Sequence, residues 1–524
     1  MSKTTPSDDI ASKVLNITDG FGKETKETTA PTYPLLISNE SYTTLSSFPV
    51  HSPSTGNLIH HFSSASITDT ETAIAAAQKS FPAWRALPPP KKRDIFLKAA
   101  DIMDSRREAL QEYMVEETGA TEGWAAFNLN LASDILRDVA GRISSITGSI
   151  PTTAQEGTNA FVYKEPYGVI LAIAPWNAPY ILGVRSIAFP LAAGNTAILK
   201  ASELSPMCSH AMVSCFYEAG LPQGVLNMIA HKPTDAAPVT KYLIEHPSIK
   251  KVNFTGSTIV GKIIAKLAGE NLKPVLLELG GKAPAIVLDD ADLVLAAKEC
   301  ALGAFLNCGQ ICMSTERVIV HEKVVTEFEF EFKKAVAESA HQDQEVGCLI
   351  NNGGADKSKR LLKDAILKGA TIIYGDPVNG EGAKMKPVII KGTTKDMDIF
   401  YTESFGPTVS LMVVKSDDEA LELANDTEYG LSAAVFTRDL ARGLRFAREV
   451  ESGAVHINGM TVHDETALPH GGEFFKSYFF LYMRERLKKW LIQRLPGMKA
   501  SGYGRFGASG LEEWVRTKTV TYKD

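Results

Sequence analysis

A chain of 524 residues, 44% of them hydrophobic, is long enough for two or more domains with large cores. The formal net charge of −6, with no basic block before the C-terminal region, argues against nucleic acid as a partner. The polar N-terminus lacks the apolar core of a secretory signal, and the apolar run 169–174 is too short to cross a membrane. Six scattered cysteines without a C-x-x-C pair indicate a reducing compartment, so we expect a cytoplasmic protein without a metal site.

The predicted elements begin after residues 1–32, which are rich in Ser, Thr, Lys and Asp and predict a mobile tail. Residues 91–118 have helical spacing, and residues 141–163 predict a hairpin or a linker. From residue 168, apolar strand runs alternate with helices. The predicted strands are 169–174, 196–199, 224–229 and 251–254, and the predicted helices are 184–193, 206–219 and 236–245. This alternation predicts an α/β fold with a parallel sheet covered on both faces, and a second α/β region spans 284–458.

Two turns that follow predicted strands carry polar residues. Pro175, Trp176 and Asn177 follow the first strand, at the end of the sheet where α/β proteins bind ligands. Gly256 lets a ligand approach the backbone, and Ser257 can cap the next helix and contact a phosphate. Taken singly, these segments are also typical of a Pro-bounded turn with an Asn cap and of a plain strand-turn-helix connection.

Two further segments supply candidates for acid–base and nucleophilic chemistry. Glu278 lies in the apolar run LLELGG, where burial would raise the carboxyl pKa towards neutrality and suit a general base; a salt-bridged structural Glu is the alternative. Cys312 ends the segment FLNCGQIC, in which Gly309 permits a sharp turn that exposes a thiol. A helix N-terminus or cationic neighbours would lower the pKa of that thiol. Cys308 and Cys312 are otherwise explained as core residues.

In their order along the chain, these segments resemble the aldehyde dehydrogenase superfamily over about residues 50–522. Glu278 and Cys312 lie 34 positions apart, in the order and spacing of that family. The likeness is greatest to the salicylaldehyde and vanillin dehydrogenase branch, which implies an aromatic aldehyde as substrate. The segments that carry this likeness are 177–185, 200–203, 309–317 and 458–465.

The resemblance implies a Rossmann-type cofactor domain, an α/β catalytic domain and a small β oligomerisation element in a homodimer or homotetramer. The implied boundaries are 33–145 with 167–280 for the NAD-binding domain, 281–508 for the catalytic domain, and 146–166 with 509–524 for the oligomerisation element.

The resemblance also implies a mechanism. Cys312 attacks the aldehyde, the Asn177 side chain and the Cys312 backbone N–H hold the oxyanion, and Glu278 activates the water that releases the acid. Relatives that transfer the acyl group to coenzyme A usually lack this Glu, so the free acid is the expected product. A catalytically idle homologue and a thioester hydrolase or acyl transferase are the alternatives, and the retained cofactor motifs argue against them.

The implied cofactor is NAD. Lys200 and Glu203 would hold the adenosine ribose hydroxyls, and the Glu203 carboxylate would repel the 2′-phosphate of NADP. Further cofactor contacts are implied for Pro175, Trp176, Gly256, Ser257, Gly261, Leu279, Glu403 and Phe405. Candidate substrate contacts, each with a structural role as its alternative, are Trp124, Tyr180 and Arg185.

One segment departs from the family pattern. The family closes with Gly-Gly, one or two residues, and then Lys-x-Ser-Gly-x-Gly-Arg, whereas residues 473–497 separate Gly472 from Met498 here. We interpret these 25 residues as a retained intron, because codons for 472–474 and 496–497 can supply the two splice signals. The alternative is a genuine amphipathic helix, whose apolar face would need a partner or a membrane surface.

Overall fold

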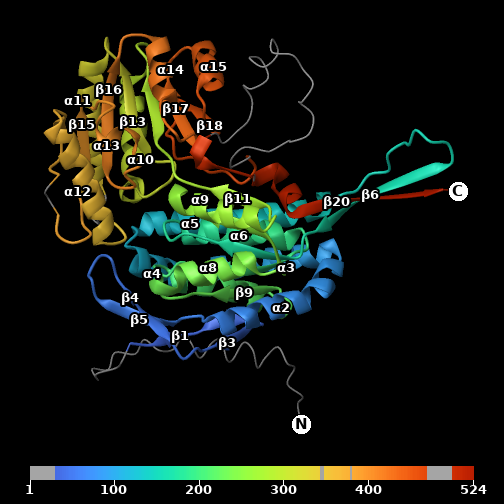
Figure 1. Cartoon of the computed structure of the whole chain (residues 1–524). Coiled ribbons are helices and arrows are strands. Elements are labelled where there is room, and N and C mark those ends of the chain that lie inside the picture. The colour runs from blue at the N-terminus through green and yellow to red at the C-terminus, as the bar shows by residue number, and fades with distance from the viewer. Residues whose placement is uncertain (1–29, 343–346, 378–379, 469–498, 505, 524) are drawn as a thin grey trace.

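The computed structural model describes residues 30–342, 347–377, 380–468, 499–504 and 506–523. Figure 1 shows two α/β bodies stacked on one another and a two-stranded ribbon that projects from their side. The predicted tail lies almost wholly outside the described residues, and its last residue, Thr32, already belongs to a strand. A small sheet at the N-terminal end has the order β1-β5-β4 and consists of β1 (Thr32–Tyr33), β4 (Ser47–His51) and β5 (Leu58–Ser63).

The first body contains an eight-stranded sheet in the order β19-β11-β10-β7-β8-β9-β2-β3. Its strands are β2 (Leu35–Ile37), β3 (Glu40–Tyr42), β7 (Val169–Ile173), β8 (Thr196–Lys200), β9 (Leu226–Ile229), β10 (Ile249–Thr255), β11 (Val275–Glu278) and β19 (Gly502–Tyr503). Strands β7 to β11 are parallel, as their uninterrupted apolar runs predict. Strands β8 and β9 lie on one side of β7, and strands β10 and β11 lie on the other side. The strand order therefore switches between β7 and β10, which is where α/β sheets open a ligand crevice.

Two groups of helices cover this sheet, and the reversal of strand order places them on opposite faces. One group is α6 (Pro179–Ala192) and α7 (Pro206–Glu218), covered in turn by α3 (Pro89–Ser105), α4 (Arg107–Thr118) and α5 (Glu122–Arg142). The other is α2 (Ile67–Ala86), α8 (Ala236–Glu245) and α9 (Thr258–Glu270). The predicted helix 236–245 is confirmed, whereas 91–118 forms two helices that meet at Arg106, whose ψ of 14° interrupts the first one.

The second body contains a seven-stranded sheet in the order β14-β15-β16-β13-β12-β17-β18, parallel except for β14. The strands are β12 (Ala283–Val287), β13 (Thr315–His321), β14 (Thr371–Tyr374), β15 (Val388–Lys391), β16 (Thr408–Val414), β17 (Ser432–Phe436) and β18 (Ala454–Ile457). The helices are α10 (Leu293–Phe305), α11 (Val325–Gln342), α12 (Asn352–Leu367), α13 (Asp398–Tyr401), α14 (Asp417–Asn425) and α15 (Leu440–Glu449).

Alternate residues of β12, together with Leu288 directly after it, enter two different cores of this second body. Ala285 and Val287 pack with residues of α10 and α11, whereas Ile286 and Leu288 pack with residues of α14 and α15. Successive side chains of a strand point to opposite faces, so a sheet covered on both sides needs apolar residues at every position. The confirmed α/β prediction rests on this pattern.

Residues 141–163, predicted as a hairpin or a linker, contain the end of helix α5, a connection and the start of the projecting ribbon. Helix α5 continues to Arg142, a single bridge joins Ser149 to Val162, and β6 (Thr158–Pro166) takes the C-terminal strand β20 (Val515–Lys523) as its antiparallel partner. Pairing with so remote a strand leaves no local signal in the sequence. The structure thus brings 146–166 and the C-terminal residues together, while their role in oligomerisation stays a prediction.

The C-terminal part of the segment 281–508, predicted as catalytic, returns to the first sheet. In β19, Gly502 and Tyr503 pair with Glu278 and Leu277 of β11. A side chain at Gly502 would lie 2.0 Å from the Leu277 carbonyl oxygen, so only glycine allows this close approach. The anomalous segment 473–497 lies outside the described residues. In the described part of the chain, no helix is long and apolar enough to cross a bilayer.

Candidate active site

The predicted site residues of the first body lie where its parallel strands end. Asn177 follows β7, Lys200 ends β8, Ser257 follows β10 and Glu278 ends β11. The carboxyl ends of parallel strands share one edge of a sheet, so these four side chains border the crevice at the switch point. The second body lies against this edge of the first sheet, since Asn177 donates to the Gln310 carbonyl oxygen and Gly281 N donates to Glu403.

A strained turn carries the candidate nucleophile. After α10, the backbone of Asn307, Cys308 and Gly309 is left-handed at three successive residues, with φ angles of 48°, 55° and 70°. Each non-glycine residue in this conformation costs about 1–3 kcal/mol, which surrounding contacts must offset. A side chain at Gly309 would lie 2.3 Å from the Gly406 carbonyl oxygen. The predicted sharp turn is confirmed, and it leaves Cys312 half-buried three residues further on.

Cys312 lines a cavity of about 830 Å³, its open mouth included, whose wall is mostly apolar. Trp124 and Phe127 form an aromatic wall with stacked rings, their centroids 5.3 Å apart and their planes at 20°. Ile181 and Leu182 of α6 add aliphatic surface. Such a volume and lining fit a small, flat, apolar ligand.

A charged pair forms the polar part of the cavity wall. Arg185 Nη2 lies 2.6 and 2.7 Å from the two carboxylate oxygens of Asp464, and both side chains are largely buried. Arg185 also lies over the Phe506 ring. The prediction that Arg185 faces the substrate space is consistent with this position. Asp464 was not identified from the sequence, although it lies in the NGMTVHDE segment that carried the resemblance.

Asn177 is held in place by its neighbours. Its side-chain amide donates to the backbone carbonyl oxygen of Gln310 at 2.9 Å. The backbone carbonyl oxygen of Asn177 accepts from the Trp124 indole N–H at 3.0 Å. An amide has two N–H donors, so one remains for a ligand oxygen. Trp124 therefore both lines the cavity and orients the backbone of Asn177. Sequence reasoning also missed Gln310, which is nearly fully buried.

Tyr180 is corrected from a substrate contact to a structural residue. It is fully buried, its hydroxyl donates to the Leu110 carbonyl oxygen at 2.6 Å, and it does not line the cavity. On helix α6, the cavity side belongs to Ile181, Leu182 and Arg185.

Burial raises the pKa of both candidate reacting groups. It raises the pKa of Glu278 to about 8; Arg185 opposes this rise and Asp464 adds to it. The predicted shift towards neutrality is confirmed. Burial and the Glu278 charge raise the pKa of the Cys312 thiol to about 12, so the predicted lowering is wrong. The physical reason is that carboxylates rather than free cations surround the thiol, since Asp464 pairs with Arg185.

Residues predicted to hold the adenosine end of a dinucleotide surround the ends of β8 and β10. Lys200 is buried and Glu203, whose charge acts on it, is half-buried. Ser257 caps α9 by accepting from the Val260 backbone N–H. Gly261 packs against Leu279, since a side chain there would lie 2.4 Å from a Leu279 methyl carbon. The N-terminal turn of α9 follows β10, at the edge of the sheet where α/β proteins bind ligands.

Residues predicted to hold the nicotinamide end come from both bodies. The Gly281 N–H donates to the Glu403 carboxylate at 2.9 Å, and burial raises the pKa of Glu403 to about 7. Phe405 packs edge-on against Trp176, with ring centroids 5.9 Å apart. Residues far apart in the sequence are therefore neighbours here, and half-buried Pro175 precedes Trp176 in the same turn.

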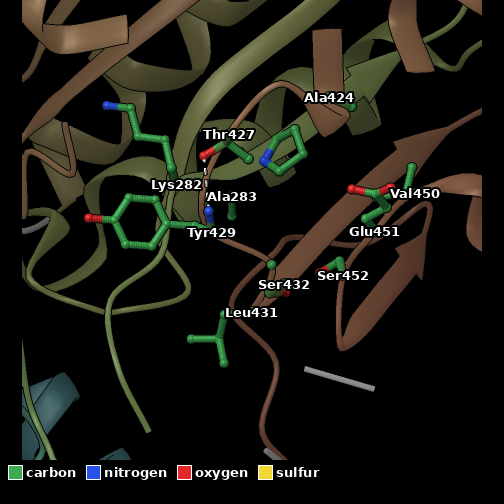
Figure 2. A pocket seen from close by; sticks show the side chains of 12 residues that line it. Lys282, Ala283, Ala424, Thr427, Tyr429, Leu431, Ser432, Val450, Glu451 and Ser452 are labelled. Atoms are coloured by element: carbon green, nitrogen blue, oxygen red, sulfur yellow. Dashed lines mark hydrogen bonds between the residues drawn. The ribbon is translucent and has the colours of Figure 1, made fainter. Parts of the chain in front are cut away.

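A second, smaller pocket lies within the second body (Figure 2). Its space is about 220 Å³, and Thr427, Tyr429 and Glu451 are among its lining residues. Lys282 also lines it, but its ammonium turns away and pairs with buried Glu316. The lining includes no thiol, so the cavity at Cys312 is the candidate active site.

Known proteins support this assignment. A family profile described as the aldehyde dehydrogenase family matches residues 40–477. A vanillin dehydrogenase of Pseudomonas fluorescens is 41% identical over 94% of this chain and 98% of its own length. A salicylaldehyde dehydrogenase of Pseudomonas putida is 39% identical over 90% and 93%, respectively. A crystal structure of a salicylaldehyde dehydrogenase from Pseudomonas putida G7, complexed with salicylaldehyde, superposes with a TM-score of 0.86 and 36% identity over 94% and 98% of the two chains.

The chain belongs to the aldehyde dehydrogenase family. It is an oxidoreductase that oxidises an aldehyde with NAD or NADP, in the α/β fold of that family. The predicted resemblance, fold class and enzyme class are confirmed.

Proposed function

We propose that this enzyme oxidises an aromatic aldehyde to the free carboxylic acid with NAD as cofactor. The observation that carries the proposal is the apolar cavity with the Trp124–Phe127 wall, which opens onto Cys312. Stacked rings favour a flat ring as ligand over a flexible chain. The vanillin and salicylaldehyde dehydrogenases among its relatives are named for aromatic substrates.

In the proposed first step, the Cys312 sulfur attacks the aldehyde carbon and gives up its proton. Because the thiol pKa is about 12, a neighbouring base has to accept that proton as the bond forms. Glu278 would accept it, because its pKa of about 8 makes it a stronger base than an ordinary carboxylate and formation of the carbon–sulfur bond drives the transfer. The aldehyde oxygen becomes an oxyanion, which the Asn177 amide and the Cys312 backbone N–H would hold. Losing one such donor costs about 10²–10³ in rate.

In the proposed second step, the thiohemiacetal carbon on Cys312 loses a hydride and becomes a thioester. The nicotinamide cofactor, when bound, supplies the hydride acceptor. Glu278 then passes the thiol proton to solvent and removes a proton from the water that attacks the thioester. It returns this proton to the Cys312 sulfur as the acid leaves. A base whose charge acts on Cys312 favours hydrolysis over acyl transfer to another thiol.

The residues at the crevice fit a dinucleotide. Lys200 is buried at the end of β8, and the charge of Glu203 acts on its ammonium. A ligand with hydroxyl groups between Lys200 and Glu203 would give a hydrogen-bond partner to both the ammonium and the carboxylate. The absence of a side chain at Gly280 leaves room for the Glu403 carboxylate, because a Cβ atom at position 280 would lie 2.8 Å from a Glu403 carboxylate oxygen. Glu403 would then accept from the ribose of the nicotinamide half.

We propose NAD rather than NADP because Glu203 carries a carboxylate beside the ribose site. A 2′-phosphate would face that charge at short range and in a partly buried setting. Because Lys200 would offset part of this repulsion, we expect a higher kcat/KM with NAD than with NADP rather than an absolute requirement for NAD. Replacing Glu203 by Gln should lower the ratio of the two kcat/KM values by raising activity with NADP.

Formation of reduced cofactor from matched benzaldehydes and straight-chain aldehydes tests the proposal. We expect a higher kcat/KM for the benzaldehydes and the free acid as product. Cys312→Ala should abolish turnover, whereas Cys300→Ala, at a fully buried cysteine of α10, should retain it. Turnover by the Cys312→Ala variant would contradict the nucleophile assignment. A preference for straight-chain aldehydes would contradict the substrate class.

A further inference from the structure

A buried ion pair, outside the reacting groups described so far, lies in the second body beside the segment 402–405. Lys282 directly precedes β12 and Glu316 lies in the neighbouring β13, and their side chains are 1% and 4% exposed. The Lys282 ammonium donates to the Glu316 carboxylate and to the Thr402 carbonyl oxygen, the latter at 2.8 Å. Such pairs are costly to bury, and well-packed apolar residues often stabilise a fold as much. Stability alone therefore gives little reason for the pair.

The Glu316 carboxylate holds the backbone of the segment 402–405. One of its oxygens accepts from Ser404 N at 2.8 Å and from Phe405 N at 3.1 Å, and the other accepts from Ser404 N at 3.0 Å. Phe405 has a φ of 51°, a strained conformation for an aromatic residue. Hydrogen bonds to a charged acceptor are stronger than those to a neutral one, so the bonds to Glu316 offset that strain.

The segment that carries Lys282 also touches both sides of the reaction space. Gly281 N donates to Glu403, and a side chain at Gly280 would collide with the Glu403 carboxylate. A side chain at Gly281 would lie 2.1 Å from the Cys312 carbonyl oxygen. The segment 280–282 is thus in contact with the nucleophile's backbone, while Lys282 and Glu316 fix the segment 402–405 relative to it.

We propose that the Glu316–Lys282 pair is a positioning device, which sets Glu403 and Phe405 at the distance from Cys312 that hydride transfer requires. The inference rests on the proposed function in one respect: it takes Glu403 and Phe405 as contacts of the nicotinamide half. Neither Glu316 nor Lys282 touches a reacting atom. They act through the backbone of residues 402–405 and through Gly281.

The main variant is the double substitution Glu316→Leu with Lys282→Met. It removes both charges together, keeps the side-chain volumes, and leaves the Ser404 and Phe405 N–H groups without their acceptor. Glu316→Gln is the second variant, because it keeps one acceptor oxygen and protects the test if the double variant fails to fold. The matched control is Lys251→Met, at a buried lysine paired with Glu513 in the first body.

Three measurements test the inference. Hydrogen exchange of the Ser404 and Phe405 amides, measured without substrate, reports how firmly Glu316 holds this backbone. The affinity for AMP reports whether the adenosine half of the site is intact. The primary isotope effect on kcat, with an aldehyde deuterated at its formyl carbon, reports how far hydride transfer limits the rate. In the double variant we expect amide exchange to rise at least about tenfold. We expect AMP affinity to stay within about twofold and the isotope effect to increase, with a smaller change in Glu316→Gln.

Unchanged exchange at Ser404 and Phe405 would overturn the inference. So would faster exchange with an unchanged isotope effect, which would show that the anchoring has no bearing on hydride transfer. If the Lys251→Met control showed the same changes, their cause would be general destabilisation, and the inference would also be overturned. Absence of reduced cofactor in the unaltered enzyme with every aldehyde would instead refute the proposed function. The exchange data would still report the anchoring of residues 402–405.

Discussion

At the scale of single residues, the two proposed reacting groups, buried Glu278 and half-buried Cys312, are acids that disfavour each other's charge. The pKa of Glu278 rises to about 8 and that of Cys312 to about 12, each with burial as the main cause. An ionised Glu278 raises the thiol pKa further, so the titrations of the two groups are coupled. Nucleophile and base are consequently both neutral over much of the physiological range.

The first prediction concerns the pH dependence of thioester hydrolysis. Glu278 acts as a base only when ionised, so the single-turnover rate of acid release should rise with pH and level off above about 8. Glu278→Gln should remove this rise and slow acid release by about 10²–10⁴-fold. Rapid-quench measurement of the acid checks both. An unaltered pH profile in the variant would show that another group activates the water.

The second prediction concerns stability. A carboxyl whose pKa is raised on folding binds more protons in the folded state than in the unfolded state between its ordinary pKa of 4.5 and about 8. The free energy of unfolding should therefore fall as pH rises through that window. Glu278→Gln should lessen this fall, so denaturant midpoints of the two proteins should diverge towards alkaline pH. Parallel midpoint curves would refute the raised pKa.

At the scale of elements, the turn 307–309 determines where the nucleophile lies. It ends helix α10 with three successive left-handed residues and packs against the carbonyl of Gly406, next to Phe405. The turn therefore joins the nucleophile to the same segment that Glu316 holds. Its geometry is a property of two elements in contact, since neither α10 nor the segment 402–406 alone would impose it.

The third prediction is the effect of Gly309→Ala. The added methyl group would lie 2.3 Å from the Gly406 carbonyl oxygen, at a φ of 70°. We expect a loss of about 1–3 kcal/mol in stability and a lower kcat, because the turn must move. Gly141→Ala, inside α5 and without neighbours near the added methyl group, is the control and should stabilise the fold by about 0.5–1 kcal/mol. Equal kcat in the two variants would contradict the role of the turn.

At the scale of the whole molecule, the site lies between two bodies and a ribbon extends from them. The projecting β6–β20 ribbon exposes the large side chains of Val520, Tyr522 and Tyr163, and a lone two-stranded ribbon is only marginally stable in water. We infer that a second copy of the chain covers it, which would make the enzyme a homodimer or homotetramer.

The fourth prediction follows from that inference. Val520→Lys with Tyr522→Lys should reduce the molar mass in light scattering to that of one chain and leave the circular dichroism spectrum unchanged. Thr519→Lys, on the opposite face of β20, is the control and should keep the assembly. If the double variant keeps the mass of the unaltered protein, the ribbon does not form the interface.

The fifth prediction concerns the segment 473–497. As a retained intron, it should be absent from the main transcript, and sequencing of cDNA across Gly472 and Met498 checks this. A protein that lacks the 25 residues should be at least as active as the full chain. A transcript that always retains the segment would leave the amphipathic helix as the explanation.

Several site residues could be predicted because their signal is local. Asn177 follows a buried strand, Glu278 lies in an apolar run, and Gly309 precedes Cys312 at a turn; each was placed where the structure has it. Glu316 and Asp464 were missed, since a single charged residue in a sequence gives no sign of its buried partner. Lys282 and Arg185 supply those partners from distant positions.

The sequence by itself determined the alternation of strands and helices, the turn at Gly309 and the family, because apolar periodicity, glycine and short motifs act within a few residues. Only the tertiary structure decided that Trp124 and not Tyr180 faces the cavity, that β6 pairs with β20, and that the Cys312 pKa rises. Side-chain facing, strand pairing and desolvation all depend on residues brought together from remote parts of the chain.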